Sequence, residues 1–216
     1  MTRPSFITFE GGEGCGKTTQ LQHLAHRLTT AGLSVLTLRE PGGTPLGESI
    51  RDLLKHHPAG SGMSPEAELL LFAASRAELV RKSIQPALAA GRWVLCDRFL
   101  DSTTVYQGRA RSLPADAVQA VNRLATAGTV PGLTLILDMP PGPALARARA
   151  RTARSGGPDR MEDEPAAFYE SVRAGFHAVA AAEPTRVKLI PADAPEADVA
   201  SAVWKEVTHA FPHLLA

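Results

Sequence analysis

The sequence predicts an α/β fold, a three-layer sandwich in which a five-stranded parallel sheet carries helices on both faces. Short apolar runs alternate with longer segments of helical spacing along all 216 residues. The runs are nearly continuous in apolar residues, which is typical of strands that are buried on both faces. Regular alternation of strands and helices indicates a parallel sheet, because each helix carries the chain back to the start of the next strand.

The expected strands lie at 5–10, 34–39, 93–97, 133–138 and 187–190. Helical spacing is found at 19–32, 64–90, 114–127, 142–153, 165–182 and 195–209. Gly32 is typical of a helix end, and Ser64 followed by Pro65 is typical of a helix start. No internal repeat or long linker interrupts the pattern, so we expect a single domain over residues 1–216.

Composition and charge exclude several classes of protein. Apolar residues make up 44% of the chain and charged residues 21%, as in an ordinary globular domain. The formal net charge is only +1, so the chain lacks the excess of basic residues that is typical of nucleic-acid-binding proteins. No apolar run approaches the roughly 18 residues of a membrane span, and the N-terminus lacks the apolar core of a signal peptide. Because there are only two cysteines, Cys15 and Cys96, we expect a reduced, cytoplasmic protein. From the net charge and the short apolar runs, we expect that it binds neither nucleic acids nor membranes.

The stretch GGEGCGKT at 11–18 fits the phosphate-binding pattern G-x-x-x-x-G-K-[ST], the P-loop, in full. It stands between an expected strand and an expected helix, which is the context that supports the pattern. Backbone N–H groups of such a loop surround phosphates, and the following helix adds its positive N-terminal end. We expect Lys17 to reach the β- and γ-phosphates of ATP and Thr18 to ligate Mg²⁺. The expected ATP-binding residues are Gly11, Gly12, Glu13, Gly14, Cys15, Gly16, Lys17, Thr18 and Thr19.

Other motifs narrow the class of P-loop protein. The chain lacks the D-x-x-G and N-K-x-D motifs of a GTPase switch, and it is short for a motor. A kinase of a small acceptor needs an acceptor pocket, further cations and a lid against water. The expected strand at 93–97 ends in Asp97, at the sheet edge where ligands bind in such folds. We expect Asp97 to hold Mg²⁺ and Arg98, beside it, to hold an acceptor phosphate.

The expected helix around 70–80 supplies a candidate base pocket. Phe72 and Arg76 are four residues apart, so they share one face of the helix. A phenyl ring can stack on a flat base while a guanidinium donates hydrogen bonds to a carbonyl edge. The pair alone is weak evidence, because a core Phe beside a solvated Arg is the commoner arrangement.

Six motifs, in order and spacing, resemble those of bacterial thymidylate kinases, P-loop nucleoside monophosphate kinases, over essentially the full chain. They are FEGGEGCGKTTQ, REPGGTPLGESIR (39–51), LLFAASRAEL, VLCDRFLDSTTVYQG, LTLILDMP and an arginine-rich segment that ends in DRME (159–162). The resemblance implies a P-loop NTPase fold with a lid segment. It further implies a homodimer that transfers the γ-phosphate of ATP to dTMP with Mg²⁺, giving dTDP.

The resemblance assigns roles to individual side chains around the base and the sugar. Phe72 would stack on thymine, and Arg76 would bond its O4 edge. Thr103 and Gln107 fall where the family places polar contacts to the base. Tyr106 falls where a tyrosine packs against the sugar and leaves no room for a 2′-hydroxyl.

On the acceptor phosphate, the resemblance implies that Arg98 acts together with Arg39 or Arg51. Glu13, inside the P-loop, matches the acid that approaches the acceptor nucleotide in this family. Gly14 follows Glu13, so the P-loop carries no arginine of its own.

The segment RTARSGGPDR at 151–160 is expected to form a mobile lid loop, because it is rich in Gly, Arg and Ser. The charge on a phosphoryl group in transfer needs cations beyond Lys17 and Mg²⁺. The chain is densest in arginine between 147 and 160, where Arg147 and Arg151 share one helix face. We expect the lid to bring a cation to the transferring phosphate from one of three positions, Arg151, Arg154 or Arg160.

Two alternatives remain open. Another pyrimidine nucleotide kinase, acting on dCMP or UMP, would share the P-loop and the lid. A regulatory module that binds ATP or GTP without transfer belongs to a different class, and the acceptor-side motifs argue against it.

Overall fold

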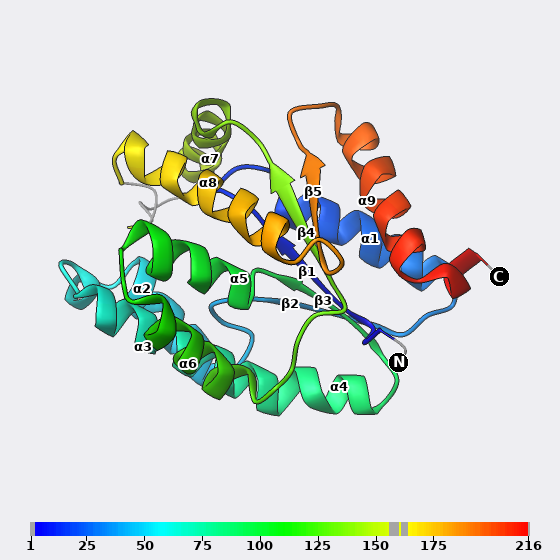
Figure 1. The fold of residues 1–216 in the computed structure, drawn as a ribbon, viewed down its shortest axis with the longest axis horizontal. Coiled ribbons are helices and arrows are strands. Elements are labelled where there is room, and N and C mark those ends of the chain that lie inside the picture. Colours follow the sequence, from blue (N-terminus) through cyan, green and yellow to red (C-terminus); the bar gives the residue numbers. More distant parts are fainter. Residues whose placement is uncertain (1–2, 156–159, 161–163, 216) are drawn as a thin grey trace.

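The computed structural model describes residues 3–155, 160 and 164–215. Its sheet is parallel, with strand order β2-β3-β1-β4-β5, so β1 lies in the centre between β3 and β4 (Figure 1). The strands are β1 (Phe6–Glu10), β2 (Val35–Arg39), β3 (Trp93–Asp97), β4 (Leu133–Asp138) and β5 (Val187–Pro191). The predicted strands are confirmed, with bounds that differ by at most one residue.

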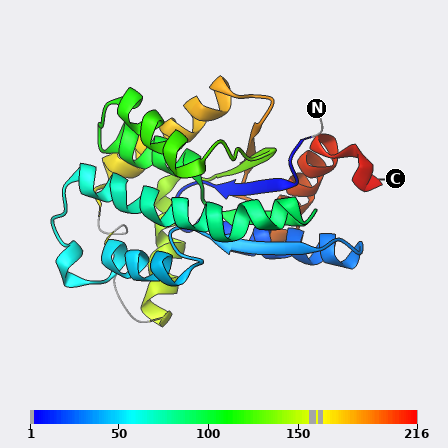
Figure 2. The ribbon, with the colours of Figure 1, turned by 90° about the horizontal axis from the view of Figure 1, so that it is seen from below.

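The helices alternate with the strands along the chain. They are α1 (Lys17–Thr30), α2 (Pro45–Lys55), α3 (Pro65–Leu79), α4 (Gln85–Ala89), α5 (Leu100–Thr103), α6 (Ala115–Thr126), α7 (Pro141–Ser155), α8 (Ala166–Ala182) and α9 (Glu196–Ala210). Two π-helical segments continue α3 and α5, η2 (Val80–Ile84) and η3 (Thr104–Ala110). Figure 2 shows α3, η2 and α4 as one continuous rod, which corresponds to the single helix expected at 64–90.

Each face of the sheet is buried by its own set of helices. On one face, α1 and α9 pack against side chains such as Ile7, Leu95 and Leu135. On the other face, η2 packs against Phe6 and neighbouring side chains of β3, while α8 and η3 cover β4 and β5. This two-sided burial explains why the central strands are apolar throughout, and it confirms the three-layer α/β prediction.

Two helical regions were not expected as helices. The helix α2 begins directly after Thr44, whose Oγ1 accepts a hydrogen bond from the N–H of Gly47 at 3.0 Å, and Pro45 occupies its first turn. The short helix α5 and its continuation η3 follow β3 directly. Both lie in segments that we considered only as motifs, and both carry residues of the site described below.

The third difference concerns the segment expected to be a lid loop. Helix α7 extends to Ser155, two residues beyond the helical spacing expected at 142–153, so the first half of the expected lid loop, 151–155, is helical. No Gly or Pro interrupts the stretch from Ala144 to Ser155, which explains why the helix continues. The Gly-Gly-Pro-Asp part of the segment, at 156–159, lies outside the described residues.

Candidate functional site

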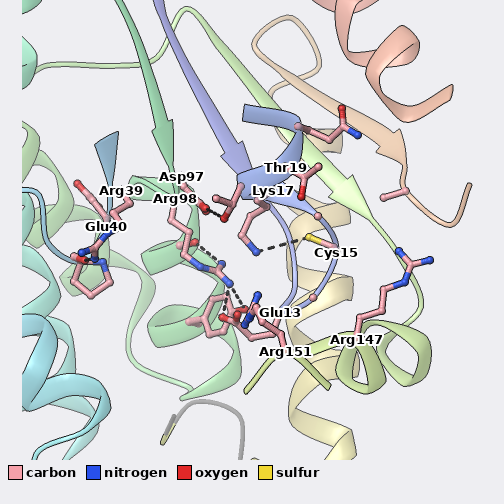
Figure 3. A pocket seen from close by; sticks show the side chains of 18 of the residues that line it. Glu13, Cys15, Lys17, Thr19, Arg39, Glu40, Asp97, Arg98, Arg147 and Arg151 are labelled. Carbon is pink, nitrogen blue, oxygen red and sulfur yellow. Dashed lines mark hydrogen bonds and ion pairs between the residues drawn. The ribbon is translucent and has the colours of Figure 1, made fainter. Parts of the chain in front are cut away.

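A cleft of about 1110 Å³ opens at the carboxyl ends of β1 and β3. In parallel sheets with helices on both faces, ligands bind at this edge. Its walls come from the P-loop after β1, the end of β3, the helices α3 and α7, the segment η3 and the start of α9. Figure 3 shows the cleft with Lys17, Asp97 and Arg98 pointing into it from neighbouring elements.

The P-loop takes its shape from glycines with positive φ. Gly11, Gly14 and Gly16 have φ of 128°, 74° and 95°, a region that favours glycine. Gly14 is also restricted from outside, because a Cβ there would collide with the backbone carbonyl of Ala144 in α7. Helix α7 therefore packs directly on the loop through backbone atoms.

Lys17 is folded onto the loop that carries it. Its side chain is buried, and Nζ donates to the carbonyl oxygens of Gly12 at 2.7 Å and of Gly11 at 3.3 Å. The ammonium also lies 3.7 Å from Sγ of Cys15. A phosphate bound in the loop would take the place of these carbonyls as the partner of the lysine, as the P-loop pattern predicts.

Thr18 and Asp97 meet at the loop's mouth. Oγ1 of Thr18 donates a hydrogen bond of 2.6 Å to Oδ2 of Asp97, although the two residues are 79 positions apart. A hydroxyl and a carboxylate are hard oxygen donors of the kind that Mg²⁺ prefers. The pair therefore fits a magnesium site, and both residues were expected to be ligands of Mg²⁺.

Arg98 and Glu13 form a partly buried ion pair, in which Nη2 of Arg98 lies 2.6 Å from Oε1 of Glu13. Although burial opposes the charge on Glu13, the charges of Arg98 and Lys17 hold the pKa of this carboxyl well below its usual range. Arg98 also donates to the hydroxyl of Tyr106 at 3.3 Å and lies over its ring. These contacts join the P-loop, the end of β3 and η3 in one cluster.

Arg98 adopts a left-handed backbone conformation, with φ of 69°. Such a conformation is uncommon for a non-glycine residue and is often held by surrounding contacts at functional sites. Here the contacts come from Glu10, whose carboxyl accepts hydrogen bonds from the backbone N–H groups of Phe99 at 2.8 Å and Ser102 at 3.2 Å. The turn that aims Arg98 is thus fixed from the end of the neighbouring strand.

Glu10 was not singled out from the sequence, where it is simply the last residue of an apolar strand. It is fully buried, and burial together with the charge of Asp101 raises its pKa to about 7. A glutamate at the end of an otherwise apolar run was the only available signal, because its partners follow some 90 positions later.

Arg39 and Arg51, expected near the acceptor phosphate, both line the cleft. Nη2 of Arg39 makes a two-oxygen contact with Glu48, at 3.0 and 2.9 Å. Nη1 of Arg51 donates to the carbonyl oxygen of Pro41 at 2.9 Å. The peptide bond before Pro41 is cis. Helix α2, which carries Arg51, thus contributes to the wall of the cleft.

Phe72 lines the cleft as expected, but Arg76 is buried behind its wall. Nε of Arg76 donates to Oε2 of Glu40 at 2.8 Å, and Nη1 donates to Oγ1 of Thr103 at 2.9 Å. The remaining bonds run to Asn122 and to the carbonyl oxygen of Phe99. We expected the guanidinium of Arg76 to face a base. Helical spacing places Arg76 on the face of Phe72, but it does not show that the acidic partner Glu40 lies opposite.

Thr103, Tyr106 and Gln107 all line the cleft from one stretch of helix. Nε2 of Gln107 donates to Oε1 of Glu68 at 2.8 Å, so the amide is held from behind. The ring of Tyr106 packs edge-on against Phe168 of α8. The three expected contact residues are thus brought together, and Glu68 joins them without having been predicted.

The expected lid arginines are distributed over different places. Arg151, with Arg147, lines the cleft from α7 (Figure 3). Arg160 instead donates to Oε2 of Glu68 at 2.6 Å and to the carbonyl oxygen of Leu54 at 3.0 Å. The side chain of Arg154 lies outside the described part of the structure. Of the three, Arg151 is therefore the one that the structure describes at the cleft wall.

Comparisons with known proteins agree with this geometry. The family profile "Thymidylate kinase" matches residues 9–203. The chain is 52% identical over 207 residues to a thymidylate kinase of Synechococcus sp. (strain JA-2-3B'a(2-13)), with 96% of each chain covered. It is 50% identical to a thymidylate kinase of Thermomicrobium roseum, with 94% of each covered. The crystal structure of thymidylate kinase from Ehrlichia chaffeensis superposes with a TM-score of 0.75 at 35% identity, covering 94% of this chain and 97% of that one.

Proposed function

The chain belongs to the thymidylate kinase family, and we propose how its residues carry out that reaction, the ATP-dependent phosphorylation of dTMP to dTDP. The observation that carries the proposal is one cleft that is lined both by the P-loop residues 13–19 and by Phe72, Arg98 and Tyr106. Phosphoryl transfer requires little covalent chemistry, so the protein must align two phosphates and neutralise the charge that moves between them.

On the ATP side, backbone N–H groups of residues 11–19 surround the phosphates, and Lys17 exchanges its loop carbonyls for phosphate oxygens. Thr18 and Asp97 would hold Mg²⁺, which supplies charge neutralisation on the ATP phosphates. Asp97 need not act as a base, because the acceptor phosphate oxygen is already ionised. The bond between Thr18 and Asp97 supports this pairing, since it holds both oxygens at the loop before any ligand arrives.

On the acceptor side, Arg98 binds the phosphate of dTMP together with Arg39 or Arg51. The left-handed backbone of Arg98, fixed by Glu10, aims the guanidinium at the P-loop and so at the incoming γ-phosphate. Glu13 holds Arg98 in place and approaches the acceptor nucleotide.

At the nucleoside end, Phe72 stacks on thymine while Thr103 and Gln107 contact its polar edge. Arg76 supports this wall through its hydrogen bond to Thr103, and it would reach the O4 edge of the base by giving up another acceptor, Asn122 or the carbonyl oxygen of Phe99. Tyr106 packs against the sugar and excludes a 2′-hydroxyl. Its burial against Phe168 supports a fixed position for the ring, which steric exclusion requires.

A lid over residues 151–160, within one kinase domain from 1 to 216, would exclude water, whose attack wastes ATP. We propose Arg151 as the cation that reaches the transferring phosphate, with Arg154 and Arg160 as the further candidates. The place of Arg151 on the cleft wall supports this choice.

We also propose a homodimer formed through the face of α2, α3 and α6. These helices pack side by side, and each exposes a leucine, Leu46, Leu70 and Leu124, with 52%, 59% and 83% of its surface accessible. Large exposed apolar side chains on adjacent helices are typical of a protein interface. The mass of the purified chain in light scattering tests this proposal, and a monomer at micromolar concentration would contradict it.

Among the described residues, no helix is long and apolar enough to cross a membrane. A cytoplasmic location remains our proposal from the cysteine content and the nucleotide substrates.

One experiment tests the reaction against its alternatives. ADP release is measured in a coupled assay with ATP–Mg²⁺ and each of dTMP, dUMP, dCMP, UMP, dGMP and AMP. We expect the highest kcat/KM with dTMP. A preference for dCMP or UMP would indicate another pyrimidine nucleotide kinase, and ATP binding with no product for any acceptor would indicate a regulatory module.

A further inference from the structure

Two buried charges of opposite sign lie behind the wall of the cleft that holds Thr103 and Gln107. The anion is Glu68, in the first turn of α3, which is 1% exposed. One carboxylate oxygen of Glu68, Oε1, accepts from Nε2 of Gln107 at 2.8 Å. The other, Oε2, accepts from Arg160 at 2.6 Å, and Arg111 lies 3.3 Å from both oxygens. The cation is Arg76, which donates to Oγ1 of Thr103.

Glu68 is held as a carboxylate. Burial alone would raise its pKa, but the hydrogen bonds from Arg160 and Gln107 and the charge of Arg111 bring the pKa below its usual value. An ionised carboxylate only accepts hydrogen bonds, so Gln107 must present its NH₂ group to it. The carbonyl oxygen of the same amide is then turned away from Glu68, and Gln107 is one of the residues that line the cleft.

Arg76 has the opposite effect on Thr103. A guanidinium only donates, so the hydroxyl oxygen of Thr103 is occupied as an acceptor and its own hydrogen is directed elsewhere. Thr103 and Gln107 are four positions apart along one helical stretch and line the same cleft. The wall therefore offers a hydrogen-bond donor beside a hydrogen-bond acceptor, in an order fixed by the charges behind it.

Pyrimidine bases differ in the pattern that they present to such a wall. Thymine and uracil carry a carbonyl oxygen at C4 beside an N3–H donor. Cytosine carries an amino group at C4 beside a bare N3, so its donor and acceptor are exchanged. The wall complements the pattern of thymine and uracil. With cytosine, the amide oxygen of Gln107 would face the bare N3, so two hydrogen-bond acceptors would meet and oppose binding.

We propose that Glu68 is a positioning residue that sets base specificity: by fixing the amide of Gln107, it admits a base with an N3–H and rejects one with a bare N3. This inference rests on the proposed function of the cleft, whose nucleoside end contains Gln107. Glu68 itself lies behind the wall and acts through the amide of Gln107. Among the described hydrogen bonds of the Gln107 side chain, the bond to Glu68 is the one that sets the orientation of the amide.

The test uses Glu68→Gln, which keeps the size of the side chain and removes its charge. A glutamine at 68 both donates and accepts, so the amide of Gln107 can turn either edge toward the cleft. We expect the ratio of kcat/KM for dTMP over dCMP to fall at least tenfold. The ratio of dTMP over dUMP should stay within twofold, because both bases carry an N3–H. If Glu68 made a merely structural contact, its loss would lower kcat/KM for dTMP, dCMP and dUMP by similar factors.

Three controls make the test decisive. Gln107→Met should lose the same discrimination, and adding Glu68→Gln to it should change the dTMP-to-dCMP ratio no further. If Glu68→Gln does not fold, as judged by thermal melting, Glu68→Asp replaces it as the test. The shorter side chain withdraws the carboxylate from Gln107, so the dTMP-to-dCMP ratio should fall in this variant too. Arg111→Met removes a partner of Glu68 without touching Gln107, so it should keep the parent ratio.

The outcomes separate this inference from the function on which it rests. A parent chain that does not prefer dTMP would overturn the proposed function itself. A parent that prefers dTMP, combined with a Glu68→Gln variant whose dTMP-to-dCMP ratio stays within twofold of it, overturns the role of Glu68. That role is equally overturned if Arg111→Met shifts the ratio as strongly as Glu68→Gln.

Discussion

The proposed phosphate side and the proposed base side of the cleft are built in different ways. The proposed phosphate side is one contiguous stretch, 11–19, whose backbone and whose own lysine would form the binding surface. The base side consists of side chains joined across the chain, such as Glu40 with Arg76, 36 positions apart, and Glu68 with Gln107, 39 positions apart. Local chain geometry thus creates the first surface, and tertiary packing creates the second.

The comparison predicts that substitutions on the phosphate side lower kcat, whereas substitutions on the base side weaken dTMP binding. We expect the largest effect for a substitution of Lys17. Lys17→Ala should lower kcat by at least about a hundredfold, because a preorganised charge on the transferring group is worth on the order of 3 kcal/mol. Thermal melting should show a folded protein, since the described hydrogen bonds of the ammonium go only to groups of its own loop, the carbonyls of Gly11 and Gly12 and Sγ of Cys15. Lys205→Ala, on the exposed side of α9, is the matched control and should match the parent. Activity of the Lys17 variant above a tenth of the parent would remove the lysine from the mechanism.

A smaller effect is expected on the same side at α7. Arg151→Ala should lower kcat by at least tenfold while KM for dTMP stays within a few-fold, the signature of an interaction made mainly in the transition state. Arg149→Ala provides the control, because Arg149 lies on the same helix, is exposed, and is outside the set of described residues that line the cleft. Steady-state kinetics of the two variants measure the difference. Equal kcat in both would show that the phosphate moves without Arg151.

The base side should respond in binding rather than in turnover. Phe72→Ala should weaken dTMP binding by about 1–3 kcal/mol, the value of stacking on one base. ATP affinity should change little, because Phe72 belongs to α3 and not to the P-loop. Calorimetric titration of each nucleotide measures both quantities. If dTMP binds the variant as tightly as the parent, the base lies elsewhere in the cleft.

This division also explains what the sequence could predict. The strands follow from apolar runs, and the P-loop follows from a pattern whose residues are neighbours in the chain. Thr18 and Asp97 are distant in sequence, yet both were expected to hold Mg²⁺. The P-loop pattern pointed to Thr18, and the end of a strand at the ligand-binding edge of the sheet pointed to Asp97.

On the base side, helical spacing suggested only the pair Phe72 and Arg76, as weak evidence, and the resemblance added Thr103, Tyr106 and Gln107. The buried acids that hold these side chains, Glu40 and Glu68, were not expected. Helical spacing places Phe72 and Arg76 on one face, but it cannot reveal that Glu40 stands opposite the guanidinium. Glu68 looked like an ordinary residue of a first helical turn, where acidic side chains are common. Arg160 was expected at the phosphate, but in the structure it contacts Glu68, a pairing that depends on tertiary packing.

The contact of α7 with the P-loop also affects the evolutionary freedom of the motif. The general pattern leaves the positions between its first glycine and its last glycine open to any residue. In this fold, position 14 is closed, because the carbonyl of Ala144 occupies the space of a Cβ, whereas a Cβ on Gly12 would meet nothing within 4 Å. Gly12 and Gly14 look equivalent in the motif, but only Gly12 leaves space for a side chain during evolution. The constraint on Gly14 comes from a helix that is encoded 130 codons downstream.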